Sequence, residues 1–153
     1  MESTNLEAML KQAALFRKVH GRVCFRELAS YNFSPSEIDI LIIMSNNPNI
    51  NTAKEFVFYL NISKGLVCRS VDALLKRGLL EAHEDKYDKR IQRLILKDCD
   101  EIISKIKYAK QTFEKELLKG IHKEDLDRVS DTIGKLNENL QKIEKGENGN
   151  ESI

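Results

Sequence analysis

The chain has 153 residues, which fits one domain at the usual size of roughly 100–200 residues. Hydrophobic residues make up 41% and charged residues 32%, so the chain can bury a core, and this excludes both a disordered protein and a membrane-embedded one. The 25 basic and 24 acidic residues nearly cancel, so any basic surface for nucleic acid must be local. With only 7 glycines and 2 prolines, an all-β fold of many short strands is excluded as well.

Export and membrane insertion are not predicted. The first residues are polar and acidic with no apolar run behind them, and the longest apolar stretch, residues 40–44, is far shorter than a membrane span. Cys24, Cys68 and Cys99 are odd in number and lack a C-x-x-C spacing, which argues against a disulfide framework or a zinc ribbon. We therefore expect a cytoplasmic protein with reduced thiols.

Residues 4–31 are predicted to form a long first helix. Apolar residues recur there at spacings of three, four or seven, which places them in one stripe. A helix of this length with a single apolar stripe is typical of one that packs against a partner. The stripe consists of Leu6, Met9, Leu10, Ala13, Phe16 and Val23.

Three shorter helices are predicted next. Two starts are marked by capping boxes, in which a Ser or Thr and the Glu three residues later satisfy each other's backbone N–H groups. Pro35 suits the first position of a helix, and Gly78 is a typical helix end. The expected ranges are 34–46, 52–60 and 63–78, with caps at Ser34 and Glu37, at Thr52 and Glu55, and at Ser63.

A β-hairpin is predicted after the fourth helix. Leu79–Glu84 and Ile91–Leu96 are two short strands, and apolar and polar residues alternate in the second. Between them lies the charged loop Asp85–Arg90, which predicts a polar hairpin tip.

Two helices are predicted to close the chain. The fifth carries an apolar stripe and is broken at Gly120, and the sixth has apolar residues at spacings of 3, 4, 3, 4 and 3, which is an a/d heptad seam. The polar tail, residues 146–153, is expected to be flexible. The stripe consists of Ile102, Ile106, Ala109, Phe113 and Leu117, and the seam consists of Leu126, Val129, Ile133, Leu136, Leu140 and Ile143.

Short helices followed by a two-stranded hairpin predict a winged helix-turn-helix, so the fold class is mainly α with a small β-hairpin wing. A helix that enters a major groove needs small residues for close approach and long donors for bases and phosphates. Residues 63–93 hold eight basic against five acidic residues, which makes this part locally basic. The outward face of the fourth helix has the required composition: Lys64, Gly65, Cys68, Arg69, Asp72 and Lys76.

Over residues 6–143 the chain resembles the MarR family of bacterial transcription regulators. The best-matched stretch is Leu60-Asn61-Ile62-Ser63-Lys64-Gly65-Leu66-Val67-Cys68-Arg69-Ser70-Val71, continued by Leu74-Leu75-Lys76-Arg77-Gly78-Leu79. Asp88-Lys89-Arg90, with Leu94 and Leu96 behind it, is similar to the family's D-x-R wing. The resemblance implies that Arg90 enters the minor groove, that Asp88 holds the wing, and that the first, fifth and sixth helices form a dimer interface.

The expected organisation is a single MarR-like domain over residues 1–145. Its winged helix-turn-helix core covers about 34–97, and its dimerisation helices cover about 4–31 and 98–143. Besides the wing-stabilising Asp88, the predicted DNA contacts are Thr52, Ser63, Lys64, Gly65, Cys68, Arg69, Ser70, Lys76, Lys86, Lys89 and Arg90.

The predicted function is that of a homodimeric, sequence-specific DNA-binding regulator. Two-fold symmetry predicts a pseudo-palindromic operator in double-stranded DNA with half-sites about one helical turn apart. The resemblance implies a repressor relieved by a small, often aromatic, ligand between the dimer region and the DNA lobe. Phe16, His20 and Tyr31 are candidates for that ligand site, with core packing as the alternative role of each.

Two other functions remain open. The heptad seam also fits a dimeric adaptor that binds a protein and has lost DNA binding. Cys24 lies beside Arg22 and Arg26, and a cationic neighbourhood could lower its pKa as a redox sensor requires, but a plain packed thiol is the expected role.

Neither an enzyme nor a metal or cofactor site is expected. His20, His83 and His122 are scattered along the chain and form no ligand motif. The chain also has no nucleophile elbow, no P-loop and no H-E-x-x-H motif.

Overall fold

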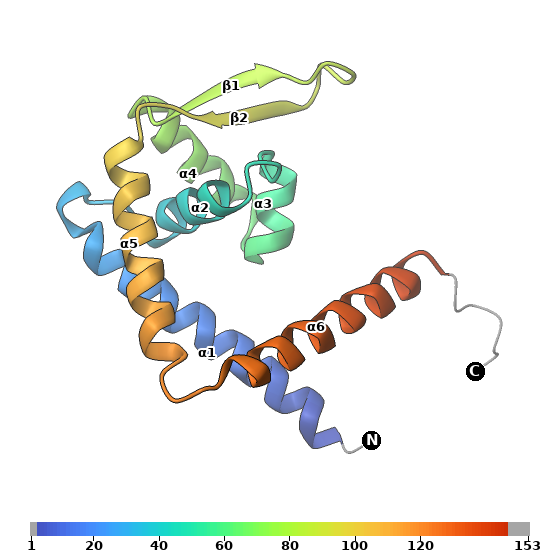
Figure 1. Ribbon diagram of the computed structural model, residues 1–153. Coiled ribbons are helices and arrows are strands. Elements are labelled where there is room, and N and C mark those ends of the chain that lie inside the picture. The colour runs from blue at the N-terminus through green and yellow to red at the C-terminus, as the bar shows by residue number, and fades with distance from the viewer. Residues whose placement is uncertain (1–2, 147–153) are drawn as a thin grey trace. The chain divides into compact units, whose positions relative to one another are not determined.

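A computed structural model describes residues 3–146 (Figure 1). It is mainly helical with one two-stranded hairpin, which confirms the predicted fold class. The described chain divides between Glu114 and Lys115 into two compact units, and most of the predicted flexible tail lies outside the described residues. The elements are α1 (Ser3–Glu27), the 3-10 helix η1 (Ala29–Tyr31), α2 (Pro35–Asn46), α3 (Ala53–Leu60), α4 (Lys64–Lys76), β1 (Leu80–Glu84), β2 (Gln92–Leu96), α5 (Asp100–Leu117) and α6 (Lys123–Glu144).

The predicted helix starts are confirmed by their caps. In α2, the Ser34 hydroxyl accepts a hydrogen bond from the Glu37 N–H while the Glu37 carboxylate accepts one from the Ser34 N–H, both at 3.3 Å. Thr52 and Glu55 form the same reciprocal pair at the start of α3. The Ser63 hydroxyl caps α4 by accepting from the N–H three residues on. Local side chains therefore determine where these helices begin.

The first helix is shorter than predicted. It ends at Glu27 rather than near residue 31, and η1 follows. Asn32 then adopts a left-handed conformation with φ 54° and reverses the chain. Leu28 and Phe33, on either side of this turn, are both buried. Leu28 and Phe33 continue the apolar pattern of α1 beyond its end, because both side chains enter the core. The pattern alone therefore predicted a helix that was too long.

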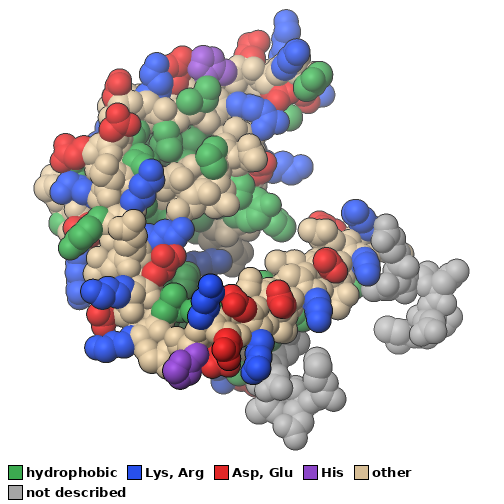
Figure 2. All heavy atoms as spheres, viewed as in Figure 1, with side chains coloured by type: hydrophobic (Ala, Val, Ile, Leu, Met, Phe, Trp, Pro, Cys, Tyr) green, Lys and Arg blue, Asp and Glu red, His purple; other side chains and the backbone are tan. Residues whose placement is uncertain are grey.

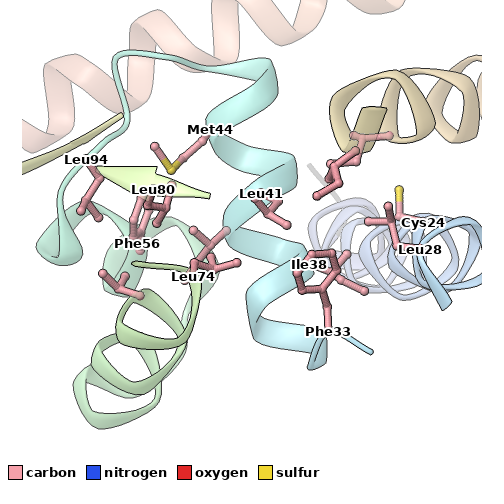
Figure 3. Packing of buried hydrophobic residues seen from close by; sticks show 14 of the residues in the cluster. Cys24, Leu28, Phe33, Ile38, Leu41, Met44, Phe56, Leu74, Leu80 and Leu94 are labelled. Carbon is pink, nitrogen blue, oxygen red and sulfur yellow. The ribbon is translucent and has the colours of Figure 1, made fainter. Parts of the chain in front are cut away.

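The hydrophobic core lies in the first unit. The fully buried side chains of Ile40, Leu41, Phe56, Val67 and Leu74 join α2, α3 and α4. Figure 3 shows how this core continues toward the hairpin at one end and toward α1 at the other. This packing holds α4 by its inner face and leaves its outer face exposed.

The hairpin is attached to the core at its base. β1 and β2 are antiparallel, with Leu80 opposite Leu96 and Glu84 opposite Gln92. Leu94 is buried and its N–H donates to the Asn51 carbonyl at 2.8 Å. The linker between α2 and α3 is thus joined to β2 by a backbone hydrogen bond.

The second unit consists mainly of α6, none of whose residues is buried. Acidic and basic side chains cover its visible face in Figure 2. Five apolar residues of the predicted heptad seam are nevertheless exposed, namely Val129, Ile133, Leu136, Leu140 and Ile143. Within one described chain this seam is uncovered.

Candidate nucleic-acid interface

One face of α4 is exposed and locally basic. Lys64, Cys68, Arg69 and Lys76 are all exposed there. Gly65 lies in the first turn, and a Cβ built at this position would meet no atom within 4 Å. The backbone at the start of α4 is therefore open to close approach by another molecule.

Two predicted DNA contacts are not on this face. Ser70 is 3% exposed, and its hydroxyl lies 2.7 Å from the hydroxyl of Ser36 in α2. Thr52 is 9% exposed, and its hydroxyl donates to the Glu55 carboxylate at 2.8 Å. Both predictions are wrong for the side chains, because each hydroxyl is used inside the protein. Ser70 lies three residues after buried Val67, on the inward face of the helix.

The tip of the hairpin is organised by Asp85. One of its carboxylate oxygens accepts hydrogen bonds from the N–H groups of Tyr87 and Asp88, at 2.8 and 2.9 Å, and the other lies 2.5 Å from Arg93 Nε. The bond from Arg93 and those from the two backbone N–H groups lower the pKa of Asp85 to about 2. This role is not among the sequence predictions, although an Asp that bonds the backbone two residues on is a known turn signal.

Asp88 orients Arg90. Its carboxylate accepts from the Arg90 backbone N–H at 3.0 Å and from Arg90 Nε at 3.2 Å. The Arg90 side chain is 91% exposed, and Lys86 and Lys89 beside it are exposed too. Lys and Arg side chains are visible at this tip in Figure 2. The wing thus presents a guanidinium held from one side, with its remaining donors in solvent.

The predicted ligand residues lie at two places. Phe16 and His20 of α1 pack edge-on against Phe113 of α5, with ring centroids 5.1 and 5.2 Å away. Burial lowers the pKa of His20, and nearby Lys110 lowers it further. Tyr31 is not on the first helix as predicted; it lies in η1 and stacks on Phe33 at 5.6 Å.

A separate hollow of about 710 Å³ lies between α1 and α2. Its wall combines apolar side chains with the cations Arg17, Lys18 and Arg22. Asp39 faces it, and burial raises the pKa of this carboxyl although Arg17 acts in the opposite direction. None of the three predicted ligand residues lines it. The lining residues are Leu10, Ala13, Ala14, Arg17, Lys18, Gly21, Arg22, Phe25, Pro35, Ile38, Asp39 and Asn61.

The surroundings of Cys24 oppose the redox-sensor alternative. Its side chain is fully buried, and burial, followed by the charges of Asp39 and Glu27, raises the pKa of its thiol to about 11. Arg22 and Arg26 are exposed and do not offset this burial. A thiol with so high a pKa is a poor nucleophile at neutral pH, so the packed-thiol alternative describes Cys24.

Thiol labelling checks this directly. In the native protein at pH 7.5, we expect iodoacetamide to modify exposed Cys68 at least about a hundredfold faster than Cys24 and Cys99, which react only after local opening. Peptide mass spectrometry over time measures the three rates, and labelling in urea provides the control in which all three react. Native labelling of Cys24 as fast as Cys68 would contradict the buried, protonated thiol.

Among residues 3–146, no group of three His, Cys, Asp or Glu side chains is placed to hold a metal ion. In the same range no helix is long and apolar enough to cross a membrane.

Short helices with an exposed basic α4 and a hairpin beside it make this chain a winged helix-turn-helix protein. A model of the MarR family matches residues 31–91. This match covers most of the winged-helix core, including the α4 and wing residues that resemble the family in sequence.

Solved structures of low sequence identity share the fold. A MarR transcriptional regulator from Methanosarcina mazei Go1 is 16% identical, with a TM-score of 0.69 over 90% of this chain and 99% of that one. A MarR family transcriptional regulator from Listeria monocytogenes, complexed with a 26mer DNA, is also 16% identical, with a TM-score of 0.69 over 94% and 96%. The transcriptional regulator Tm0710 from Thermotoga maritima is 22% identical, with a TM-score of 0.57 over 94% and 99%.

Proposed function

We propose that this chain is a homodimeric regulator of transcription, without catalytic activity, that binds double-stranded DNA in a sequence-specific manner. The observation that carries the proposal is the pairing of an exposed α4 face, with Lys64, Arg69 and Lys76, and a wing that presents Arg90. Helix side chains read base edges in the major groove, whereas an arginine from the wing suits the narrower minor groove. The Listeria relative with the same fold was solved with DNA.

Dimerisation explains the exposed apolar side chains of the helices outside the core. The seam of α6 has the a/d spacing that two helices bury against each other. α1 also exposes large apolar side chains, among them Met9, Leu10 and Phe16. A second copy of the chain that covers these residues would present two recognition helices related by two-fold symmetry, which suits a pseudo-palindromic operator.

The effector of this regulator, on our proposal, is a small amphipathic anion that binds in the hollow between α1 and α2. The volume of about 710 Å³ is within the usual range of ligand pockets. Arg17, Lys18 and Arg22 supply positive charge, and Phe25 and Ile38 supply apolar contact. Because α1 is a dimerisation helix and α2 belongs to the DNA-binding core, a ligand between them could favour a spacing of recognition helices that fits DNA less well. Such a regulator is a repressor that its ligand releases.

Selection from random duplexes tests the proposal. The protein is incubated with the pool at about 100 mM salt, a regime in which phosphate contacts still contribute strongly, and retained DNA is sequenced. We expect enrichment of a palindrome whose half-sites are about one helical turn apart. With the enriched duplex, affinity should fall steeply with salt, because each phosphate contact releases counterions.

A different result would favour the adaptor. A folded dimer that enriches no sequence and shows no salt-dependent affinity for any duplex would contradict the DNA-binding function. The α4 face would then be a solvated surface, and the seam would be the main feature left to explain.

A further inference from the structure

The wing is joined to the rest of the domain by a chain of polar contacts that includes Asp85, Arg93 and Asn51. We call these three residues the brace. Arg93 Nε contacts the Asp85 carboxylate at the hairpin tip, and Arg93 Nη1 donates to Asn51 Oδ1 at 2.9 Å. One guanidinium therefore bridges the tip of the hairpin and the linker before α3. Arg93 and Asn51 are 42 residues apart in the sequence.

Asn51 is a rigid anchor for this bridge because its other polar groups are also bonded. Its backbone N–H donates to the Glu55 carboxylate at 3.0 Å, and its Nδ2 donates to the Pro48 carbonyl at 3.3 Å. Its own carbonyl accepts from the Leu94 N–H of β2 at 2.8 Å. Asn51 thus connects the α2–α3 linker, the cap of α3 and the wing, and Arg93 adds the tip.

A two-stranded hairpin needs such an attachment. An isolated hairpin is marginally stable in water at best, and in this one only Leu80 and Leu94 are buried. Leu80 lies at the base and Leu94 in the middle of β2, whereas Arg90 lies in the tip, two residues before β2 begins. Packing at these two residues leaves the direction of the tip weakly determined, and the brace connects the tip to the α2–α3 linker.

At the tip, the Asp85 carboxylate joins the brace to the turn. Asp85 holds the N–H groups of Tyr87 and Asp88 and at the same time bonds Arg93. Asp88 in turn orients Arg90. An unbroken series of hydrogen bonds therefore runs from Asn51 to the Arg90 guanidinium.

We propose that the brace is a positioning unit that holds Arg90 at the angle required to enter the minor groove. Arg93 is a positioning residue: it bonds two side chains of the protein, Asp85 and Asn51, and acts on DNA through Arg90. The inference rests on the proposed DNA-binding function and adds a determinant of wing geometry to it.

A double-mutant cycle tests the coupling. We expect Arg93→Leu to weaken binding to the selected duplex by about tenfold in the wild-type background, and by less than about twofold when Arg90 is already Ala, because coupled residues lose an interaction only once. Arg93→Lys, which keeps the charge but lacks the planar guanidinium whose Nε and Nη1 reach the two partners, should fall between Leu and wild type. Fluorescence anisotropy on one labelled duplex measures all four corners of the cycle.

Lys97→Met is the matched control, because it breaks another exposed hairpin ion pair, with Glu81 at 2.7 Å, and leaves the brace intact. Its effect should be equally large with Arg90 present or absent. Equal losses for Arg93→Leu in both backgrounds would overturn the positioning role and would mean that Arg93 contacts DNA itself or only stabilises the fold.

Hydrogen exchange keeps the inference testable without DNA. In Arg93→Leu, the amides of Tyr87 and Asp88 should exchange at least about fivefold faster than in wild type, while amides in α2 keep their rates, because only the tip is released. Unchanged tip amides would overturn the brace even if the wild type binds DNA. Wild-type protein that binds no duplex but shows faster tip exchange in the variant would remove the proposed function and leave the brace as a structural unit.

Discussion

Replacing Ile133 with Glu is expected to convert the proposed dimer into a folded monomer. Ile133 is in the middle of the α6 seam and is half-exposed in the single chain, so the variant loses little within its own fold. In a dimer the side chain is lost from both copies, at about 1.5–3 kcal/mol each, and this raises the dimer dissociation constant by about 10²- to 10⁴-fold. Light scattering at micromolar concentration measures the mass.

The affinity for the operator should fall when dimerisation is lost. A monomer offers one recognition helix and one wing, so it loses the gain of about 10²- to 10⁴-fold that a tethered second site supplies. Lys135→Glu introduces the same carboxylate two residues away, off the seam, and should leave both the mass and the DNA affinity nearly unchanged. An Ile133→Glu protein with the wild-type mass would place the dimer interface elsewhere.

The sequence predicted the parts of this fold that depend on local chemistry. Capping boxes at Ser34 and Thr52 identified two helix starts within a residue, because each box is completed by side chains three residues apart. The hairpin followed from alternation and a polar tip. The exposed face of α4 followed from helical period, since residues opposite Val67 and Leu74 must face outward.

What the sequence did not predict depends on contacts between distant segments. The hydroxyl of Ser70 finds its partner, Ser36, in another helix, and the high pKa of the Cys24 thiol comes from complete burial, which outweighs the arginines beside it in sequence. The bridge from Arg93 to Asn51 joins residues 42 positions apart. Two local signals could have been used: the Asp85 turn, and the helical period that places Ser70 on the same face as Val67 and Leu74.

Removing Ser70 and Thr52 reduces the set of candidate DNA contacts. With Ser70 and Thr52 inside the protein, the candidate interface depends on fewer side chains, and Arg69 lies near the middle of the α4 face. The wing then carries more of the expected specificity. Its one arginine with an orienting carboxylate at the tip is Arg90, whereas Lys86 and Lys89 are exposed cations of the kind that bind phosphate.

Arg90→Ala is expected to weaken binding to the selected operator by about 1–3 kcal/mol, or about 5- to 150-fold, if its guanidinium contacts base edges in the minor groove. The loss should depend on sequence. The guanine N2 amino group projects into the minor groove, so wild-type protein should prefer A·T pairs under the wing and should tolerate inosine–cytosine, which lacks that group. Arg90→Ala should bind the A·T, G·C and I·C versions almost equally. Competition titrations with the three duplexes give the ratios.

Lys89→Ala separates this groove contact from simple loss of charge. It removes one cation from the neighbouring position, and a phosphate contact there predicts uniform weakening on all three duplexes and a salt slope smaller by about 1. Arg90→Ala also removes a cation, so the sequence dependence, and not the overall affinity, identifies the groove contact. If the two variants lose affinity equally on every duplex, Arg90 is another phosphate contact, and the sequence preference of the protein must come from α4.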